Sequence, residues 1–137
     1  MVNFNGVTTD DEKLFSAFNR SFLYGDGVFE TLKIVNNKIL FFEDHYFRLL
    51  ASMRIIRMQI PMTFTLEFLE EQVLALVNQQ NIQDAARVRL TVFRNDGGYY
   101  TPTDNKVSFV IQASALAVQS YVVNDGAFEV DLYKDFI

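Results

Sequence analysis

Two arginines in one strand-like stretch are the first residues whose type and spacing could do chemistry. Arg87 and Arg89 lie two positions apart in an alternating stretch that runs to Arg94, so their side chains are expected on the same face of a strand. Burying an unpaired guanidinium is costly, so such a pair in an apolar strand predicts a bound anion. The alternative is a surface ion pair with Asp84 or a neighbouring acid.

A histidine and an arginine form a second candidate group. When residues 42–58 are placed on a helix at about 100° intervals, His45 and Arg48 fall on one strip together with Ser52. The rigid fork of a guanidinium suits phosphate or carboxylate oxygens, because it offers two parallel charge-assisted hydrogen bonds. The alternatives are a solvent-facing helix arginine and a structural histidine.

The aromatic residues Tyr24 and Phe29 flank a turn-prone cluster, Gly25 to Gly27. Glycines there let a ligand approach the main chain. A phenol such as that of Tyr24 can donate a hydrogen bond to a carboxylate while its ring packs on apolar atoms. The alternative is that both are ordinary core aromatics, since the chain has 14 Phe.

Strands at both ends of the chain and two helices between them must position these residues. The pattern predicts an α+β fold with a largely antiparallel sheet that two packed helices cover on one face. Asn36 and Asn37 suit a tight hairpin turn, because Asn tolerates positive φ. Thr65 is expected to cap the second helix. The predicted elements are a hairpin at 29–42, helices at 42–58 and from 66, and strands at 87–94 and 107–117.

The two ends of the chain give weaker patterns. Residues 1–4 are expected to form an edge strand, and the stretch from Thr8 to Phe18 a short helical turn capped by Thr9 or Asp10. We expect an N-terminal α+β domain at 1–117, an interdomain linker at 118–126 and, at 127–137, the first strand of a missing C-terminal domain.

Composition excludes several classes of protein. With 137 residues, 50% of them hydrophobic, the chain fits one folded domain and not a disordered segment. A net charge of −5 argues against nucleic-acid binding. Zero Cys and one His argue against a disulfide scaffold and a metal site. There is no visible signal peptide or membrane span, so a cytoplasmic location and no membrane partner are expected.

Two motifs carry a resemblance to a known family. The stretch from Tyr24 to Thr31, YGDGVFET, followed by EDHYFRL from Glu43, resembles the N-terminal half of fold-type IV pyridoxal-phosphate enzymes. These are the class IV aminotransferases, with branched-chain aminotransferases, D-amino-acid aminotransferases and aminodeoxychorismate lyases. The segments Arg87-Val-Arg89 and Gly97-Gly-Tyr99 follow in the family's order. The resemblance implies pyridoxal 5′-phosphate as cofactor, an amino acid or aminodeoxychorismate-like substrate, and a homodimer.

The resemblance also implies a role for each candidate residue. Arg48 corresponds to the arginine that holds the cofactor phosphate. His45, one helical turn earlier, would orient Arg48 or approach the phosphate. Tyr24 and Phe29 correspond to aromatics that line the substrate pocket. We therefore expect Arg48 to share a concave site with Arg89, with Tyr24 nearby.

The resemblance also implies that the arginines of the predicted strand at 87–94 bind the substrate. Arg89 matches an arginine that recognises the substrate carboxylate, and Arg87 is assigned to substrate binding beside it. Arg87 stands where branched-chain aminotransferases carry Tyr, and Thr31 where they carry Gly. Both departures favour the lyase or the D-amino-acid branch.

The lysine that the cofactor needs is not found in the family's motif. The chain has Lys13, Lys33, Lys38, Lys106 and Lys134, and none of them matches. We therefore expect no catalytic residue here, and interpret the chain as the N-terminal part of a longer enzyme, truncated or proteolysed, that is inert alone. The alternative is a free-standing, non-catalytic α+β domain that binds an anionic small molecule or a protein partner.

Overall fold

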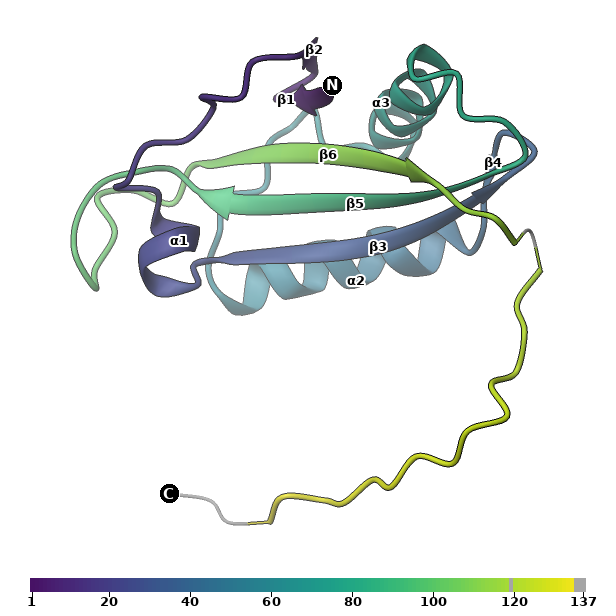
Figure 1. Cartoon of the computed structure of the whole chain (residues 1–137). Helices are drawn as coiled ribbons and strands as arrows, with labels where there is room; N and C mark the ends of the chain where they lie inside the picture. The colour runs from purple at the N-terminus through teal and green to yellow at the C-terminus, as the bar shows by residue number, and fades with distance from the viewer. Residues whose placement is uncertain (119, 135–137) are drawn as a thin grey trace.

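The computed structural model describes residues 1–118 and 120–134. These residues fold into a six-stranded sheet and three helices (Figure 1). The strands are β1 (Val2–Phe4), β2 (Val7–Thr9), β3 (Gly27–Val35), β4 (Lys38–Ile39), β5 (Ala85–Arg94) and β6 (Val107–Ala115). The helices are α1 (Arg20–Tyr24), α2 (Phe42–Ile55) and α3 (Leu66–Gln79).

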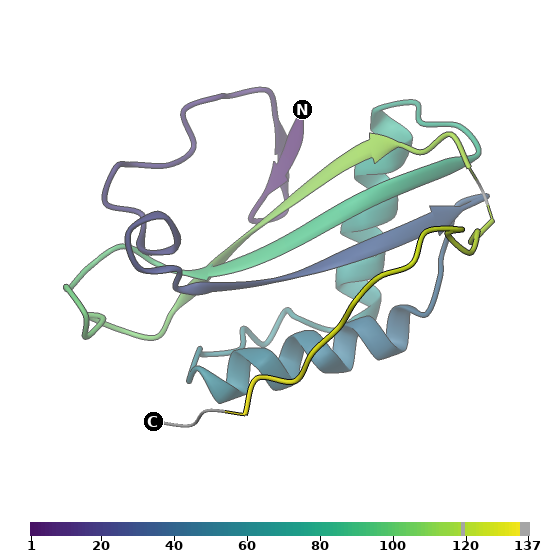
Figure 2. The ribbon, with the colours of Figure 1, turned by 60° about the horizontal axis from the view of Figure 1, so that its bottom comes forward.

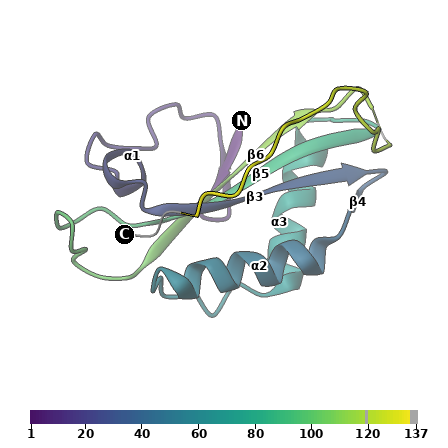
Figure 3. The same ribbon diagram turned by 90° about the horizontal axis from the view of Figure 1, so that it is seen from below.

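The strands pair antiparallel in the order β2-β1-β6-β5-β3-β4. The long central strand β5 pairs with β3 from Ala85 to Phe93 and with β6 from Ala86 to Arg94. Figure 3 shows α2 on one side of the sheet and α1 with the segment before it on the other. The predicted α+β fold with an antiparallel sheet and a helix pair is confirmed.

The hydrophobic core lies between the sheet and the two long helices, as the predicted alternation requires. Val88, Leu90 and Val92 of β5 are buried against it, while Arg87 is exposed on the opposite face. Helix α2 contributes Leu49, Leu50 and Met53, and α3 contributes Leu69, Val73, Leu76 and Val77. Figure 2 shows α2 below the strands and α3 crossing behind them. This face of the sheet is therefore closed, and the opposite face, here called the outer face, is only partly covered.

Local sequence signals explain several element boundaries. The hairpin between β3 and β4 turns at Asn36 and Asn37, whose φ angles are 49° and 60°. The side chain of Thr65 accepts a hydrogen bond from the amide of Phe68, as expected of a helix cap. Helix α2 ends at Ile55, three residues before the predicted end at residue 58, and the chain then turns at Arg57, whose φ is 60°.

Two expectations for the N-terminal segment are wrong. Strand β1 is internal, because it pairs with β6 on one side and β2 on the other. The stretch from Thr8 to Phe18 is not helical: Val7–Thr9 is strand β2, and residues 10–18 form a loop. The helical turn follows as α1, which Asn19 caps by accepting a hydrogen bond from the amide of Phe22.

The C-terminal segment runs away from the sheet beyond β6 (Figure 1). Residues 120–134 contain no strand and are exposed, and the amino group of Lys33 lies 4.2 Å from the centre of the Tyr121 ring. The strand expected at 127–137 is thus not formed within this single chain at 127–134, and its last three residues lie outside the described ones. The proposed domain boundaries stay a prediction. No helix in the described part of the chain is long and apolar enough to cross a membrane.

Candidate functional site

A buried carboxylate holds the His45–Arg48 pair in place. Glu30 lies on β3 and faces α2, where both its oxygens accept hydrogen bonds from Arg48: Nε to Oε1 at 2.7 Å and Nη2 to Oε2 at 2.5 Å. Nδ1 of His45 is 2.7 Å from the same Oε2. The predicted proximity of His45 and Arg48 is confirmed by a distance of 3.1 Å between Nη2 and Nδ1.

Glu30 and Arg48 each stabilise the charged form of the other. Burial alone would raise the pKa of Glu30, but the hydrogen bonds from Arg48 and His45 and the charge of Arg48 outweigh it and hold that pKa below its ordinary value. The same carboxylate raises the pKa of Arg48. Because an ionised Glu30 can only accept, Nδ1 of His45 must be the protonated ring nitrogen. Nη2 of Arg48 and Nδ1 of His45, 3.1 Å apart, are then two donors to the same carboxylate of Glu30.

Only one edge of the Arg48 guanidinium is used by Glu30. The bonds engage Nε and Nη2, and in the described residues Nη1 has no hydrogen-bond partner. The side chain of Arg48 is 63% exposed, against 6% for Glu30. Arg48 thus offers a fixed and solvent-accessible cation that can bind an external oxyanion such as phosphate.

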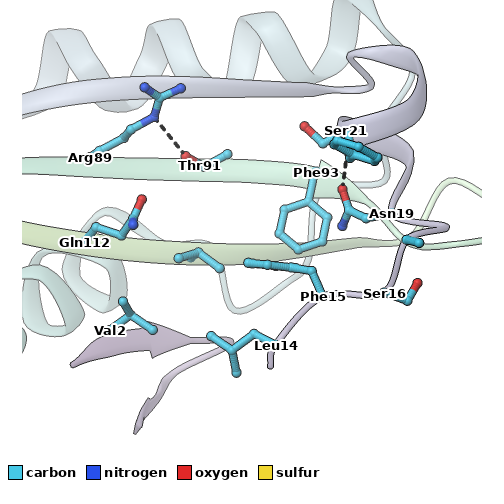
Figure 4. Close-up of a pocket in the computed structure, with 13 residues that line it drawn as sticks. Val2, Leu14, Phe15, Ser16, Asn19, Ser21, Arg89, Thr91, Phe93 and Gln112 are labelled. Atoms are coloured by element: carbon cyan, nitrogen blue, oxygen red, sulfur yellow. Dashed lines mark hydrogen bonds between the residues drawn. The ribbon is translucent and has the colours of Figure 1, made fainter. Parts of the chain in front are cut away.

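Arg89 lies on the outer face of the sheet. Its guanidinium sits over the ring of Phe29, with Cζ 3.7 Å from the ring centre, and its Nε donates to the hydroxyl of Thr91 at 3.3 Å. Figure 4 shows Arg89 and Thr91 beside Gln112 of β6. These three residues line one side of a cavity of about 730 Å³ between the outer face and the segment that leads into α1. Phe15, Phe22 and Phe93 make this cavity largely apolar.

The common site expected for Arg48 and Arg89 stays a prediction, since the large cavity that Arg89 lines does not include Arg48. Glu30, which binds Arg48, faces the helices, whereas Phe29 and Arg89 lie on the outer face. Successive residues of a strand point to opposite faces, and this separates the two arginines. Tyr24 joins neither arginine, since its ring packs against Tyr100 at 5.7 Å and Arg20 at 4.9 Å.

Arg87 is exposed on the outer face. No carboxylate in residues 1–118 and 120–134 lies within 4.0 Å of Arg87 or Arg89, so the alternative pair with Asp84 is not formed among them. Within those same residues there is no cluster of three acids or histidines that could hold a metal ion.

Sequence reasoning missed a second ionic cluster, made by Arg20, Asp26 and Arg94. Asp26 accepts from Nε of Arg20 at 2.8 Å and from Nη1 of Arg94 at 3.0 and 3.1 Å, and all three side chains are largely buried. Arg20 also donates to the carbonyls of Gly97, Tyr99 and Tyr100. Figure 1 shows that loop beside α1. Asp26 between its two glycines is the signal that could have indicated the cluster.

Comparison with known sequences gives consistent matches. A family described as amino-transferase class IV matches residues 27–133. D-alanine aminotransferase of Listeria monocytogenes is 33% identical over 121 residues, which are 86% of this chain and 40% of that protein. A Methanocaldococcus jannaschii protein named "Putative branched-chain-amino-acid aminotransferase" is 32% identical over 97 residues, or 70% of this chain and 33% of that protein. The chain thus spans two fifths or less of these relatives.

Solved structures share the fold. The branched-chain amino acid aminotransferase of Escherichia coli matches with a TM-score of 0.73 and 20% identity, over 84% of this chain and 39% of that one. The enzyme of Thermoproteus uzoniensis, solved with norvaline, gives 0.73 and 24% over 85% and 40%. A third branched-chain aminotransferase, solved with pyridoxamine 5′-phosphate, gives 0.72 and 21% over 85% and 40%.

Proposed function

The chain belongs to the class IV aminotransferase family and corresponds to the N-terminal part of its members, and we propose that it supplies the cofactor-phosphate and substrate-carboxylate contacts of a pyridoxal-phosphate enzyme. The observation that carries the proposal is the arrangement of Glu30, His45 and Arg48. The structure with pyridoxamine 5′-phosphate supports this cofactor for the family.

The residues present fit a phosphate group at Arg48. Glu30 binds the Nε and Nη2 edge of the guanidinium, which leaves Nη1 and the exposed side of Nη2 for an anion. The orientation is fixed before the ligand arrives, so less conformational entropy is lost on binding. The cofactor, once held, supplies a pyridine ring that takes up electrons from the substrate during proton transfer. Arg48 contributes to this by holding the phosphate, and His45 by holding Glu30 from its second side.

The substrate side of the proposal rests on the outer face. Arg89 would bind the substrate carboxylate, with Arg87 near it, Phe29 beneath it and Tyr24 at the pocket wall. Relatives named as D-alanine and as branched-chain aminotransferases both occur among the matches, and the Arg87 and Thr31 departures favour the D-amino-acid or lyase branch. A homodimer and a cytoplasmic location complete the proposal.

We also propose that this chain does not bind the cofactor covalently. None of its five lysines stands in the family's lysine motif. Incubation with pyridoxal 5′-phosphate, followed by borohydride reduction and mass spectrometry, should show no stoichiometric adduct at a single lysine. A complete single-site adduct would contradict the assignment of the attaching lysine to another part of the enzyme.

The phosphate contact can be tested on this chain without covalent chemistry. Pyridoxamine 5′-phosphate has no aldehyde, and pyridoxamine differs from it only by the phosphate. In a calorimetric or NMR titration, the phosphate should strengthen binding, and Arg48→Ala should remove that gain. Arg54→Ala, a change at an exposed arginine of the same helix, should leave the gain intact. Equal binding of both ligands, or an unaltered gain in Arg48→Ala, would refute the proposed phosphate site.

A further inference from the structure

One side of helix α2 carries apolar side chains that the fold leaves in solvent. Phe47 is 62% exposed and Ile55 80%, and Ala51 between them is also exposed. These three residues are spaced four apart, so they follow one another along one strip of the helix, here called the α2 stripe. Figure 3 shows α2 at the edge of the molecule, with one side facing away from the sheet.

Helix α2 is therefore apolar on two opposite sides. The side toward the sheet is buried at Leu49, Leu50 and Met53. At 100° per residue, Ala51 in the middle of the stripe lies about 160° from Met53. A surface helix normally carries polar residues on its outer side, and a helix that is apolar on both sides is typical of one buried on both. Single exposed apolar residues need no explanation, but an aligned group of them indicates a contact surface.

The largest residue of the stripe is held in place by its neighbour. The ring of Phe47 lies 5.3 Å from that of Tyr46, at an angle of 66°. Tyr46 is itself fixed, since its hydroxyl donates a hydrogen bond to the carbonyl of Phe64 at 2.8 Å. An aromatic side chain that is oriented beforehand loses little conformational entropy on binding, so Phe47 is suited to anchor an interface.

The charges at the two ends of α2 indicate which partner fits the stripe. The first turn carries the acids Glu43 and Asp44, the last turn carries Arg54, and all three are exposed. A second copy of α2 laid antiparallel along the stripe would bring the acids of each helix to the arginine of the other. The two helix dipoles would also run in opposite directions, which is favourable. A parallel pair would place like charges together.

The apolar residues fit the same antiparallel arrangement. If a two-fold axis passes beside Ala51, Phe47 of each copy lies opposite Ile55 of the other, because both are four residues from Ala51. Packed helices lie about 8–10 Å apart, and the small side chain of Ala51 allows a close approach at the centre. The stripe is thus complementary to itself in both shape and charge.

We propose that the α2 stripe is an interface between copies of this chain, in which two α2 helices pack antiparallel around Ala51. The inference goes beyond the proposed function, because the stripe contains none of the residues assigned to the cofactor or the substrate. A helix of 14 residues is about 21 Å long, so two of them bury less than the roughly 1,200–2,000 Å² of a standard interface. The association should therefore be weak, with a dissociation constant of about 0.1 mM.

A disulfide can test the contact at the two-fold axis. The chain has no Cys, so Ala51→Cys introduces its only thiol. Two such thiols would face each other in the proposed dimer, and mild oxidation should link the copies. Glu71→Cys, at an exposed position of α3, is the matched control and should cross-link at least tenfold more slowly. Equal rates for the two variants would contradict the proposed contact.

Sedimentation equilibrium from about 10 μM to 1 mM measures the association without a thiol. Ile55→Lys should raise the dissociation constant at least tenfold, because the symmetry removes each apolar contact twice. Leu132→Lys, the same kind of change in the exposed C-terminal segment, should leave the constant unaltered. Unchanged urea midpoints would show that both variants are folded. An association that survives Ile55→Lys but is lost in Leu132→Lys would place the interface elsewhere and overturn the inference.

Reversed charges test the direction of the two helices. Arg54→Glu and Glu43→Lys should each weaken self-association, because each substitution brings like charges together at both ends of the pair. An equimolar mixture of these two variants should associate more tightly than either alone, since every introduced charge then faces an opposite one. A mixture that associates no better than its components would refute the antiparallel arrangement. An unaltered chain that stays monomeric up to about 1 mM would refute the interface itself.

Discussion

Replacing Asp26 with Asn should be the most destabilising change of a single charge in this domain. Asp26 is the one carboxylate in the described part of the chain that pairs with Arg20 and Arg94, and both guanidiniums are buried to within a few per cent. Asn keeps the shape of the side chain but replaces one accepting oxygen with a donor, so the two arginines lose their counter-charge. Removing one partner of a buried ion pair costs about 3–5 kcal/mol.

The remaining hydrogen bonds place the expected loss at the lower end of that range. Arg20 would still donate to the carbonyls of Gly97 and Tyr99, and Arg94 to the carbonyl of Ile56. A loss of about 3 kcal/mol is a large share of the roughly 5–15 kcal/mol by which a domain is stable. With a urea slope of about 2 kcal/mol per molar, the unfolding midpoint should fall by about 1.5 M.

Urea unfolding followed by far-ultraviolet circular dichroism measures this loss directly. Asp125→Asn, in the exposed C-terminal segment, removes the same charge without a buried partner and should change the midpoint little. A loss below about 1 kcal/mol for Asp26→Asn would refute the inference that this carboxylate neutralises buried charge.

Two further substitutions test other parts of the structure. Because the pKa of Glu30 is lowered from its ordinary value of 4.5 in the folded state, its ionisation stabilises the fold above that value. This contribution is lost as pH falls through the lowered pKa of the folded state. Urea midpoints measured from pH 3 to 7 should therefore be lower for Glu30→Gln than for the unaltered chain near neutral pH, and this difference should shrink below about pH 4. A difference that does not change with pH would contradict the ion-pair assignment. Gly98→Ala should lower the thermal midpoint more than Gly25→Ala, since both glycines have positive φ but only at Gly98 would the added methyl overlap backbone, at the carbonyl of Thr101. Equal losses would show that the loop adjusts.

Local signals in the sequence were sufficient for much of the fold. The paired Asn residues, the Thr65 cap and the alternation after Arg87 depend on neighbours in sequence, and each predicted the observed element. The N-terminal errors have a different cause. Strand β1 is internal because Asn3 pairs with Ile111, more than a hundred residues away, and no local pattern reveals that partner.

The sequence predicted which site residues lie together on one helix, but not which residues of other elements they meet in the fold. Helical spacing correctly brought His45 to Arg48, since both lie on one element. The partner that fixes them, Glu30, lies on β3 and could be assigned only once its face of the sheet was known. The same alternation separates Arg48 from Arg89, because Glu30 and its neighbour Phe29 point to opposite sides.

The two outermost strands of the sheet are short. Strand β2 has three residues and β4 has two, and β4 pairs with β3 only at Ile34 and Val35. The stretch of β3 from Gly27 to Leu32 therefore pairs with β5 on one side and with no strand of the described chain on the other. Unpaired strand margins act as templates on which a second chain can add its own strand. The margin of β3 is therefore the part of this sheet at which a second copy of the chain would extend it through backbone hydrogen bonds.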